Sequence, residues 1–377
     1  MTSHELFYAT NRNHLGDDRW NPTGYGTGFS EDGLENLRFG RVTVQADDGI
    51  VTGYLQTTGD YGTGNGIALS DYLTKQAGDD TVTKIEAYRE ELSADTQGAT
   101  VLGSTAMFQA LQRITTQATD ILIYIHGFNV SWQDAVAAAL SLQIRLNNSP
   151  VGDGAQHLQV VLFSWPSDGK AIPYVSYKSD RSEAAASGMA FGRGVLKVRD
   201  FLMEICRRTG GNRCEQNIHL LCHSMGNYVL QNTLPRIADY AAGRALPRLF
   251  DQIFMCSPDV DADCFEGTNP LVRLPELCRS VTVYFNRHDK SMYLSDYTKG
   301  NPERLGCNGV SRPALLDAKI TTVDCTAVVT DEGVVEHSYY LDGYVTDDIR
   351  RSTDGVAPND AIRSRHATGS FGNLWAL

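Results

Sequence analysis

Six short apolar runs, separated by stretches with helical periodicity, constrain the fold of this chain more than any other feature. The runs are ILIYIHGF (121–128), LQVVLFSWP (158–166), NIHLLCHS (217–224), DQIFMCS (251–257), SVTVYFN (280–286) and AKITTVDC (318–325). Strands that are buried on both faces of a parallel sheet need such near-continuous apolarity. The alternation therefore predicts an α/β fold with a mostly parallel central sheet and helices on both faces.

The stretches between the runs carry helical stripes. Ser131 and Asp134 have the spacing of a capping box that opens a helix. In that helix the apolar residues Trp132, Val136, Leu140 and Ile144 recur four apart. A second helix is expected near residues 183–208, and a third after residue 224, where Pro235 should kink or restart it.

The two ends of the chain are less regular. LRFGRVTVQ (37–45) and GIVTGYLQTT (49–58) look like paired antiparallel strands, and GDYGTGNG (59–66) lacks phosphate-loop spacing and predicts a hairpin or surface loop. Beyond residue 345 the chain is polar, which predicts a docked or partly mobile tail. We expect N-terminal strands and helices over 1–118 and a core over 119–345, together one domain, followed by a tail over 346–377.

The net charge and the lengths of the apolar runs argue against several classes of binding partner. The net charge of -12 repels nucleic acid and anionic bilayers, so neither is expected. No apolar run approaches the roughly 20 residues of a transmembrane helix, and the N-terminus lacks the pattern of a signal peptide. A soluble, cytoplasmic protein is expected. The eight cysteines form no C-x-x-C pair, and several lie in apolar runs, so buried thiols are favoured over disulfides or metal ligands.

The segment LLCHSMGNYVL contains the candidate nucleophile. An apolar strand leads into Ser224, then Gly226, then a predicted helix, which is the context of a nucleophile elbow. The sharp turn needs small residues two positions either side of the serine. Gly226 satisfies one side and Cys222 stands where glycine is usual on the other. The alternative, a serine that only caps the helix, is less consistent with the preceding strand.

A serine hydroxyl needs a base, and the base needs an acid that orients it. In elbow enzymes of this kind the chain order is Ser, then Asp or Glu, then His. His337 is the expected base, because His366 lies in the polar tail. Asp289, on the loop after VTVYFN, is the expected acid, and Asp259 is the alternative. The D-x-D-x-D rhythm of residues 259–263 does not continue as a calcium loop.

The loop HGFN (126–129) follows the first apolar run and is the expected oxyanion loop. Gly127 permits close backbone approach, and the amides of Phe128 and Met225 are the expected donors. His126 is expected to support the loop by hydrogen bonding. With a protein group for every role, neither a metal nor an organic cofactor is expected.

Several motifs together resemble a bacterial family of predicted α/β hydrolases of unknown function. They are FYATNR (7–12), FGRVTV (39–44), IYIHGFN (123–129), HLLCHSMGN (219–227), PDVDADCF (258–265), VTVYFNRHD (281–289) and HSYY (337–340). The similarity spans roughly residues 5 to 345. It implies the α/β-hydrolase fold, with the family's Ser, Asp and His on Ser224, Asp289 and His337, and implies no substrate. Asn11 and Arg12 are candidates for tying the N-terminus to the site rim.

The leading functional hypothesis is a lipase-like serine esterase that acts on small-molecule esters through an acyl-enzyme. The alternatives are an acyltransferase on the same triad and a non-catalytic binding scaffold. The negative net charge favours short or medium uncharged acyl esters. Residues 166–182 are interpreted either as a lid over the pocket or as an ordinary surface crossover.

Overall fold

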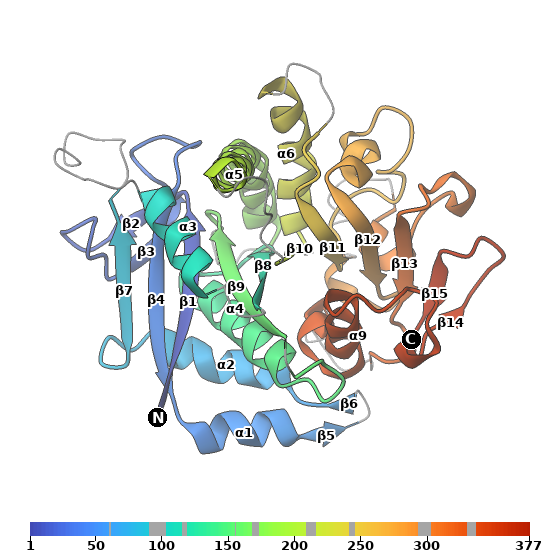
Figure 1. The fold of residues 1–377 in the computed structure, drawn as a ribbon, viewed down its shortest axis with the longest axis horizontal. Helices are drawn as coiled ribbons and strands as arrows, with labels where there is room; N and C mark the ends of the chain where they lie inside the picture. Colours follow the sequence, from blue (N-terminus) through green and yellow to red (C-terminus); the bar gives the residue numbers. More distant parts are fainter. Residues whose placement is uncertain are drawn as a thin grey trace.

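The described residues form a sheet of eleven strands with helices on both faces (Figure 1). The computed structural model describes residues 1–59, 62–89, 103–114, 119–154, 156–167, 173–208, 216–240, 246–292, 303–329 and 337–377. The strand order is β14-β15-β13-β12-β11-β10-β8-β9-β1-β4-β7. This is a large central sheet of the α/β-hydrolase type, and the predicted fold class is confirmed.

The six apolar runs form six consecutive neighbours of this sheet. They are β8 (Thr119–Ile125), β9 (His157–Ser164), β10 (Ile218–His223), β11 (Phe250–Cys256), β12 (Cys278–Phe285) and β13 (Ile320–Asp324). All of their mutual pairings are parallel. Their carboxyl ends therefore meet along one edge of the sheet, which is where active sites of open α/β folds gather.

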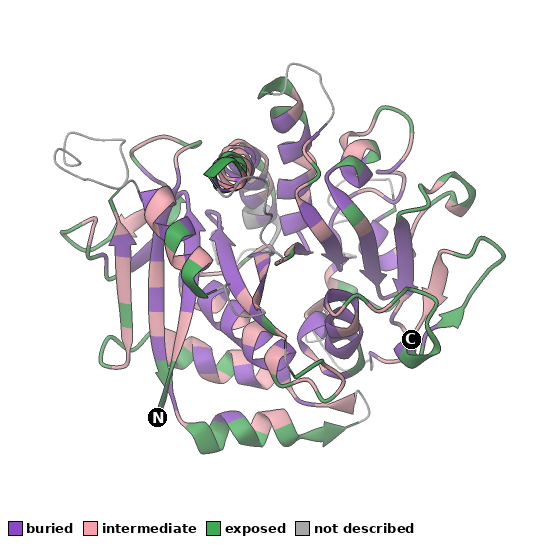
Figure 2. Cartoon of the chain, viewed as in Figure 1, coloured by how far each residue is buried: buried purple, intermediate pink, exposed green. Residues whose placement is uncertain are grey.

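Two hydrophobic cores lie on the two faces of the sheet, and the strand interiors between them are buried (Figure 2). The helices α3 (Gly103–Ile114), α5 (Pro173–Arg208) and α6 (Gly226–Tyr240) pack on one face. The helices α2 (Gly66–Ala77), α4 (Trp132–Asn147) and α9 (Gly343–Thr353) pack on the other. The capping box of Ser131 and Asp134 is present at the start of α4, as predicted.

The N-terminal part of the sheet is antiparallel, but one of the two strands expected there is not a strand. β4 (Arg38–Ala46) pairs antiparallel with β1 (Thr2–Thr10) and β7 (Thr83–Tyr88). Residues 49–58, expected as its partner strand, instead form most of helix α1 (Asp48–Gln56). Asp47 accepts hydrogen bonds from the amides of Gly49 and Ile50, and this N-cap outweighs the β-branched composition of the segment.

β1 was not predicted as a strand, yet it lies inside the sheet. It pairs parallel with β9 on one side and antiparallel with β4 on the other. Its last five residues are buried. The sheet therefore carries the first residues of the chain directly to the edge where the loops after β8 and β9 emerge (Figure 1).

The structure also tests the expected hairpin near residue 60, the expected C-terminal tail and the expected kink at Pro235. β5 (Thr58–Gly59) and β6 (Gly62–Thr63) pair antiparallel, as expected of a hairpin at 59–66, and residues 60 and 61 of that segment lie outside the described residues. Residues after 345 continue α9 and add β14 (His366–Ala367) and β15 (Leu374–Ala376) to the sheet, so the expected boundary at 345 falls inside a helix. Helix α6 runs through Pro235 without restarting.

Short elements complete the described part of the chain. They are β2 (Arg12–Leu15), β3 (Gly24–Phe29), α8 (Leu305–Asn308) and the 3₁₀ turns Pro270–Glu276, Pro313–Leu315, Tyr339–Leu341 and Ala361–Arg363. The cysteines of the described residues are free thiols, all buried except Cys206, which is half-buried. In the same residues, no helix combines the length and apolar composition needed to cross a bilayer.

Candidate active site

Ser224 lies on a strained turn between β10, which ends at His223, and α6, which begins at Gly226. Its φ of 52° is in the left-handed region that non-glycine residues rarely adopt. The turn is held in place because the Ser224 amide donates to the Cys256 carbonyl at 2.9 Å, and the Asp259 amide donates to the Ser224 carbonyl at 3.1 Å. A strained, over-determined strand-to-helix turn is the geometry of a nucleophile elbow.

The sharp turn at Ser224 requires small residues two positions before and after the serine, and both positions meet this requirement. A Cβ on Gly226 would lie 2.6 Å from the Ile125 carbonyl oxygen, so only glycine fits there. Cys222 is fully buried and its side chain belongs to the core on the α5 and α6 face of the sheet. A small apolar side chain is therefore accommodated where glycine is usual.

Asn227 holds the elbow from inside the first turn of α6, and sequence reasoning gave it no role. Its side-chain amide donates to the carbonyls of Cys222 at 2.9 Å and Ser224 at 3.1 Å. The side chain is fully buried. The only sequence signal was its position three residues after the serine.

The loop after β8 packs directly against Ser224. A Cβ placed on Gly127 would lie 2.8 Å from the Ser224 Cβ and 3.3 Å from its Oγ. Gly127 thus brings the backbone of the HGFN loop into van der Waals contact with the serine. The next residue, Phe128, packs edge-on against the Tyr177 ring, with 5.6 Å between centroids, and Met225 is fully buried.

His126 is fully buried beneath this loop. Its Nε2 lies 3.2 Å from the Trp165 amide and 3.3 Å from an Arg12 guanidinium nitrogen, both of which can only donate. Nε2 is therefore an acceptor, and Nδ1 carries the proton and donates to the Gly127 carbonyl at 2.9 Å. Burial and then the Arg12 charge hold the pKa of His126 well below its usual range, so the ring is neutral.

Arg12, the first residue of β2, anchors the same loop. Its guanidinium is fully buried and donates to the carbonyls of Val130 at 2.8 Å and Gly26 at 3.0 Å. Asn11 beside it donates to Ser187 of α5 at 3.0 Å. These contacts tie β1 to the loop that touches Ser224.

Asp289 and His337 meet beside the carboxyl ends of the central strands. The Nδ1 atom of His337 donates to Oδ2 of Asp289 at 2.8 Å. The other carboxylate oxygen, Oδ1, accepts from the Ser291 amide at 3.0 Å, and Asp289 is fully buried. The carboxylate is thereby fixed in orientation and presents one oxygen to the imidazole.

The environment of His337 favours its charged form. Burial lowers the pKa of the imidazole, but the charge and hydrogen bond of Asp289, with a further contribution from Asp259, raise the pKa of His337 overall. The side chain is 15% exposed. It is therefore a partly accessible base next to a fixed carboxylate.

The backbone of His337 is clamped to the strand ends that carry Ser224. Its carbonyl accepts from His223 Nε2 at 2.9 Å and from Ser257 Oγ at 3.0 Å. The rings of His223 and His337 pack with centroids 4.7 Å apart. Among the described residues no hydrogen bond joins Ser224 Oγ to the His337 ring, and catalytic contacts of this kind are often long without substrate.

Asp259, the alternative acid, has other partners. Its carboxylate accepts from the Tyr177 hydroxyl at 2.7 Å and lies 3.4 Å from Nε of the buried Arg304. It is 1% exposed and acts on His337 only through its charge. The structure thus places Asp289, and not Asp259, in contact with the imidazole.

Two other histidines follow Ser224 in the chain, and both are exposed. His288 is exposed beside Asp289, and His366 is exposed on β14 at the edge of the sheet. Asp259 and Asp261 pair with Arg304, and no set of three His, Cys, Asp or Glu side chains within the described ranges is arranged to hold a metal. Of the segment 166–182, residues 168–172 fall outside the described part, and residues from 173 onward begin α5, whose Tyr177 reaches the loop of Phe128.

A comparison with protein-family models decides the classification. Residues 104–346 match the family described as an α/β hydrolase of unknown function (DUF900). The chain belongs to this family. The matched segment contains Ser224, Asp289 and His337, and it leaves out β1 and Arg12. The suspected family relationship is thereby confirmed.

A relative in Nostoc sp., the uncharacterized protein alr1448, is 24% identical over 219 residues. The aligned part covers 46% of this chain and 53% of the Nostoc protein, so the match spans about half the length of that relative. The name of that relative gives no activity.

Proposed function

We propose that the protein is a serine hydrolase that cleaves carboxylic esters through an acyl-enzyme intermediate. Ser224 is the nucleophile, His337 the general base and Asp289 the acid that orients the imidazole. The observation that carries the proposal is the 2.8 Å contact between His337 Nδ1 and Asp289 Oδ2, with the His337 backbone bonded to the strand ends beside Ser224. This arrangement supports base-assisted attack by a serine.

In the proposed reaction, His337 Nε2 accepts the hydroxyl proton of Ser224 as Oγ attacks the ester carbonyl. His337 then donates that proton to the leaving alcohol as the carbon–oxygen bond breaks. A water molecule next gives its proton to His337 and attacks the acyl-enzyme, and His337 returns the proton to Ser224 as the acid leaves. Asp289 stays ionised and stabilises the imidazolium in both steps.

The oxyanion of each tetrahedral intermediate would be bound by the amides of Phe128 and Met225. The contact of Gly127 with Ser224 supports this, because it places the backbone after Gly127 next to the reacting oxygen. His126 and Arg12 support the loop from below through the Gly127 and Val130 carbonyls. Amide donors on a fixed loop need not reorient as negative charge develops on the oxyanion, and they stabilise that charge for this reason.

Substrates are proposed to be small uncharged esters with short or medium acyl chains, handled in the cytoplasm. The net charge of -12 disfavours anionic lipids and nucleic acids. Tyr177 at the start of α5 packs over Phe128, which supports a lid role for the described part of residues 166–182.

Turnover of p-nitrophenyl esters with graded acyl length tests this proposal. The wild-type protein should hydrolyse a short or medium ester, and Ser224→Ala should lose activity while keeping its circular-dichroism spectrum and Tm. A folded Ser224→Ala protein with near-normal turnover would overturn the assignment. Faster cleavage of anionic phospholipids than of neutral esters would overturn the substrate class.

A further inference from the structure

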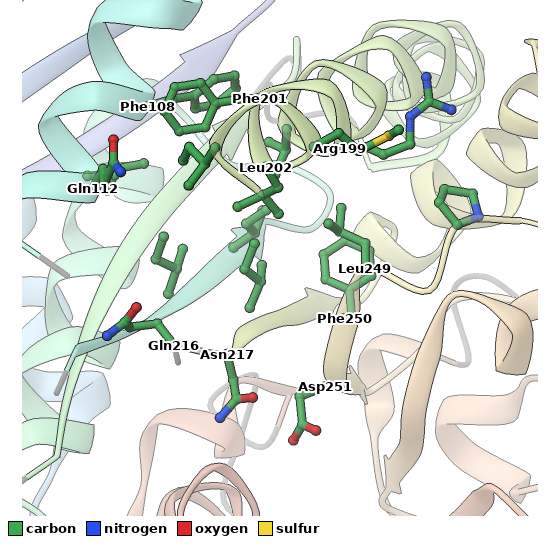
Figure 3. Close-up of a pocket in the computed structure, with 18 of the residues that line it drawn as sticks. Phe108, Gln112, Arg199, Phe201, Leu202, Gln216, Asn217, Leu249, Phe250 and Asp251 are labelled. Carbon is green, nitrogen blue, oxygen red and sulfur yellow. The ribbon is translucent and has the colours of Figure 1, made fainter. Parts of the chain in front are cut away.

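A cavity of about 790 Å³, shown in Figure 3, lies at the amino ends of the central strands. Ser224 lies at the opposite, carboxyl end of β10. The cavity is formed where α3 and the last turns of α5 pass over the amino ends of β8, β10 and β11. The rings of Phe108 and Phe201 meet at one side of it, with 5.3 Å between centroids. Leu249 and Phe250 form another side, as Figure 3 shows. Its volume is in the range of small-molecule sites.

The floor of the cavity is a partly covered patch of the central sheet. Ile121 and Ile123 of β8 face it and are only half-buried. Leu122 and Tyr124, which alternate with them on the opposite face, are 0% and 1% exposed. Central strands of a parallel sheet are normally covered on both faces. Ile121 and Ile123 are thus left with accessible apolar surface toward the cavity.

Positively charged side chains outnumber negatively charged ones in the cavity lining, whereas the chain as a whole is negatively charged. Its charged lining within the described residues consists of Arg199, Arg248, Arg279 and Asp251. Arg279 lies 3.5 Å from Asp251, and its side chain is 60% exposed. Arg199 is hydrogen-bonded to Asp200, whereas the exposed Arg248 has no ion pair with another described residue. Arg248, with Arg279 as a second guanidinium at an apolar cavity, fits an apolar chain that ends in an anion.

The cavity does not belong to the ester site. Ile218 lines it and lies six residues before Ser224 along β10, which corresponds to roughly 20 Å of extended strand. An acyl group bound to Ser224 therefore lies at the other end of the sheet.

We propose that this cavity binds a long-chain fatty acid, with the alkyl chain over β8 and the carboxylate at the arginines. The site is non-catalytic, and it would exist whether or not the protein hydrolyses esters. Transfer of each methylene out of water should tighten binding by roughly threefold to fourfold.

Calorimetric titration of the full chain with dodecanoate tests the proposal. One dodecanoate should bind per chain, octanoate should bind on the order of 100-fold more weakly, and dodecyltrimethylammonium should bind at least tenfold more weakly than dodecanoate. Leu202→Trp, which fills the cavity, should weaken dodecanoate binding at least tenfold. None of these results depends on ester turnover, which Leu202→Trp should leave unchanged.

The double variant Arg248→Gln/Arg279→Gln tests the charged end of the cavity without changing the core, because both side chains are exposed. It should weaken dodecanoate binding about tenfold and leave the Tm unchanged. Arg207→Gln is the matched control, since Arg207 lies on the last turn of α5, is 77% exposed and does not line the cavity. Absence of dodecanoate binding to the folded wild type would overturn the proposal. Unchanged binding in the arginine double variant, or equal binding of the cationic analogue, would overturn it too.

Discussion

Gly127 touches Ser224 so closely that a methyl group between them would lie 2.8 Å from the serine Cβ. Gly127→Ala should therefore displace either the loop or the serine. We expect turnover to fall roughly 100-fold or more, as when one oxyanion donor is lost, and stability to fall by about 1–3 kcal/mol through overpacking. Gly154→Ala is the control, because a Cβ there meets nothing within 4 Å. Normal kinetics in a folded Gly127→Ala protein would remove the HGFN loop from the proposed oxyanion site.

Asp289 and Asp259 should differ sharply when each is changed to asparagine. Asp289→Asn keeps the shape but offers a donor or a neutral oxygen to His337, so turnover should fall on the order of 10⁴-fold with the fold retained. Asp259→Asn should reduce turnover about tenfold or less. Its main effect should be on stability, because Arg304 is fully buried beside this carboxylate.

One ester substrate and one set of denaturation curves separate these two roles. If Asp259→Asn is the inactive variant and Asp289→Asn turns over normally, the acid lies on the loop after β11, and our assignment is wrong.

The raised pKa of His337 predicts an acid limb in the pH–rate profile. Protonated His337 cannot accept the proton of Ser224, so kcat/KM should fall as the pH drops through a value above the usual 6.5 of histidine. In Asp289→Asn the largest contribution that raises the pKa is removed, and the residual activity should show its acid limb at lower pH. A limb at the same pH in both proteins would contradict the pairing.

His126 should make the fold sensitive to acid. Its pKa is lowered in the folded protein, so the unfolded chain binds more protons, and stability should be lost as the pH falls below about 6.5. His337 acts in the opposite sense, because its raised pKa favours the folded state at low pH.

Thermal melts at several pH values test the contribution of His126. His126→Gln should melt at a lower temperature at neutral pH and show a shallower loss of Tm between pH 6.5 and pH 5. The exposed His366→Gln should behave as the wild type does. A wild-type slope in His126→Gln would mean that another group carries the acid sensitivity.

The central strands and the turn at Ser224 could be predicted from the sequence because both are local signals. Continuous apolar runs predict buried strands, and Ser224 carries its own strand–turn–helix context. The misassignment of residues 49–58 came from β-branched composition, which the Asp47 cap overrides. Arg12 contacts His126 across 114 positions in the chain, and no local pattern indicates such a contact. The sequence does not reveal the role of Asn227 for a related reason. Its side-chain amide binds backbone carbonyls that come within reach only in the folded turn.

The most direct test of the account is covalent labelling of Ser224 by a fluorophosphonate, read by intact-protein mass and peptide mapping. We expect the wild-type chain to take up one label, on the peptide that contains Ser224. Ser224→Ala should take up none, and Asp289→Asn should react far more slowly while Asp259→Asn reacts at a rate within about tenfold of wild type. Labelling that persists in folded Ser224→Ala, or a folded wild-type chain that stays unlabelled, would contradict the assignment of Ser224 as an activated nucleophile.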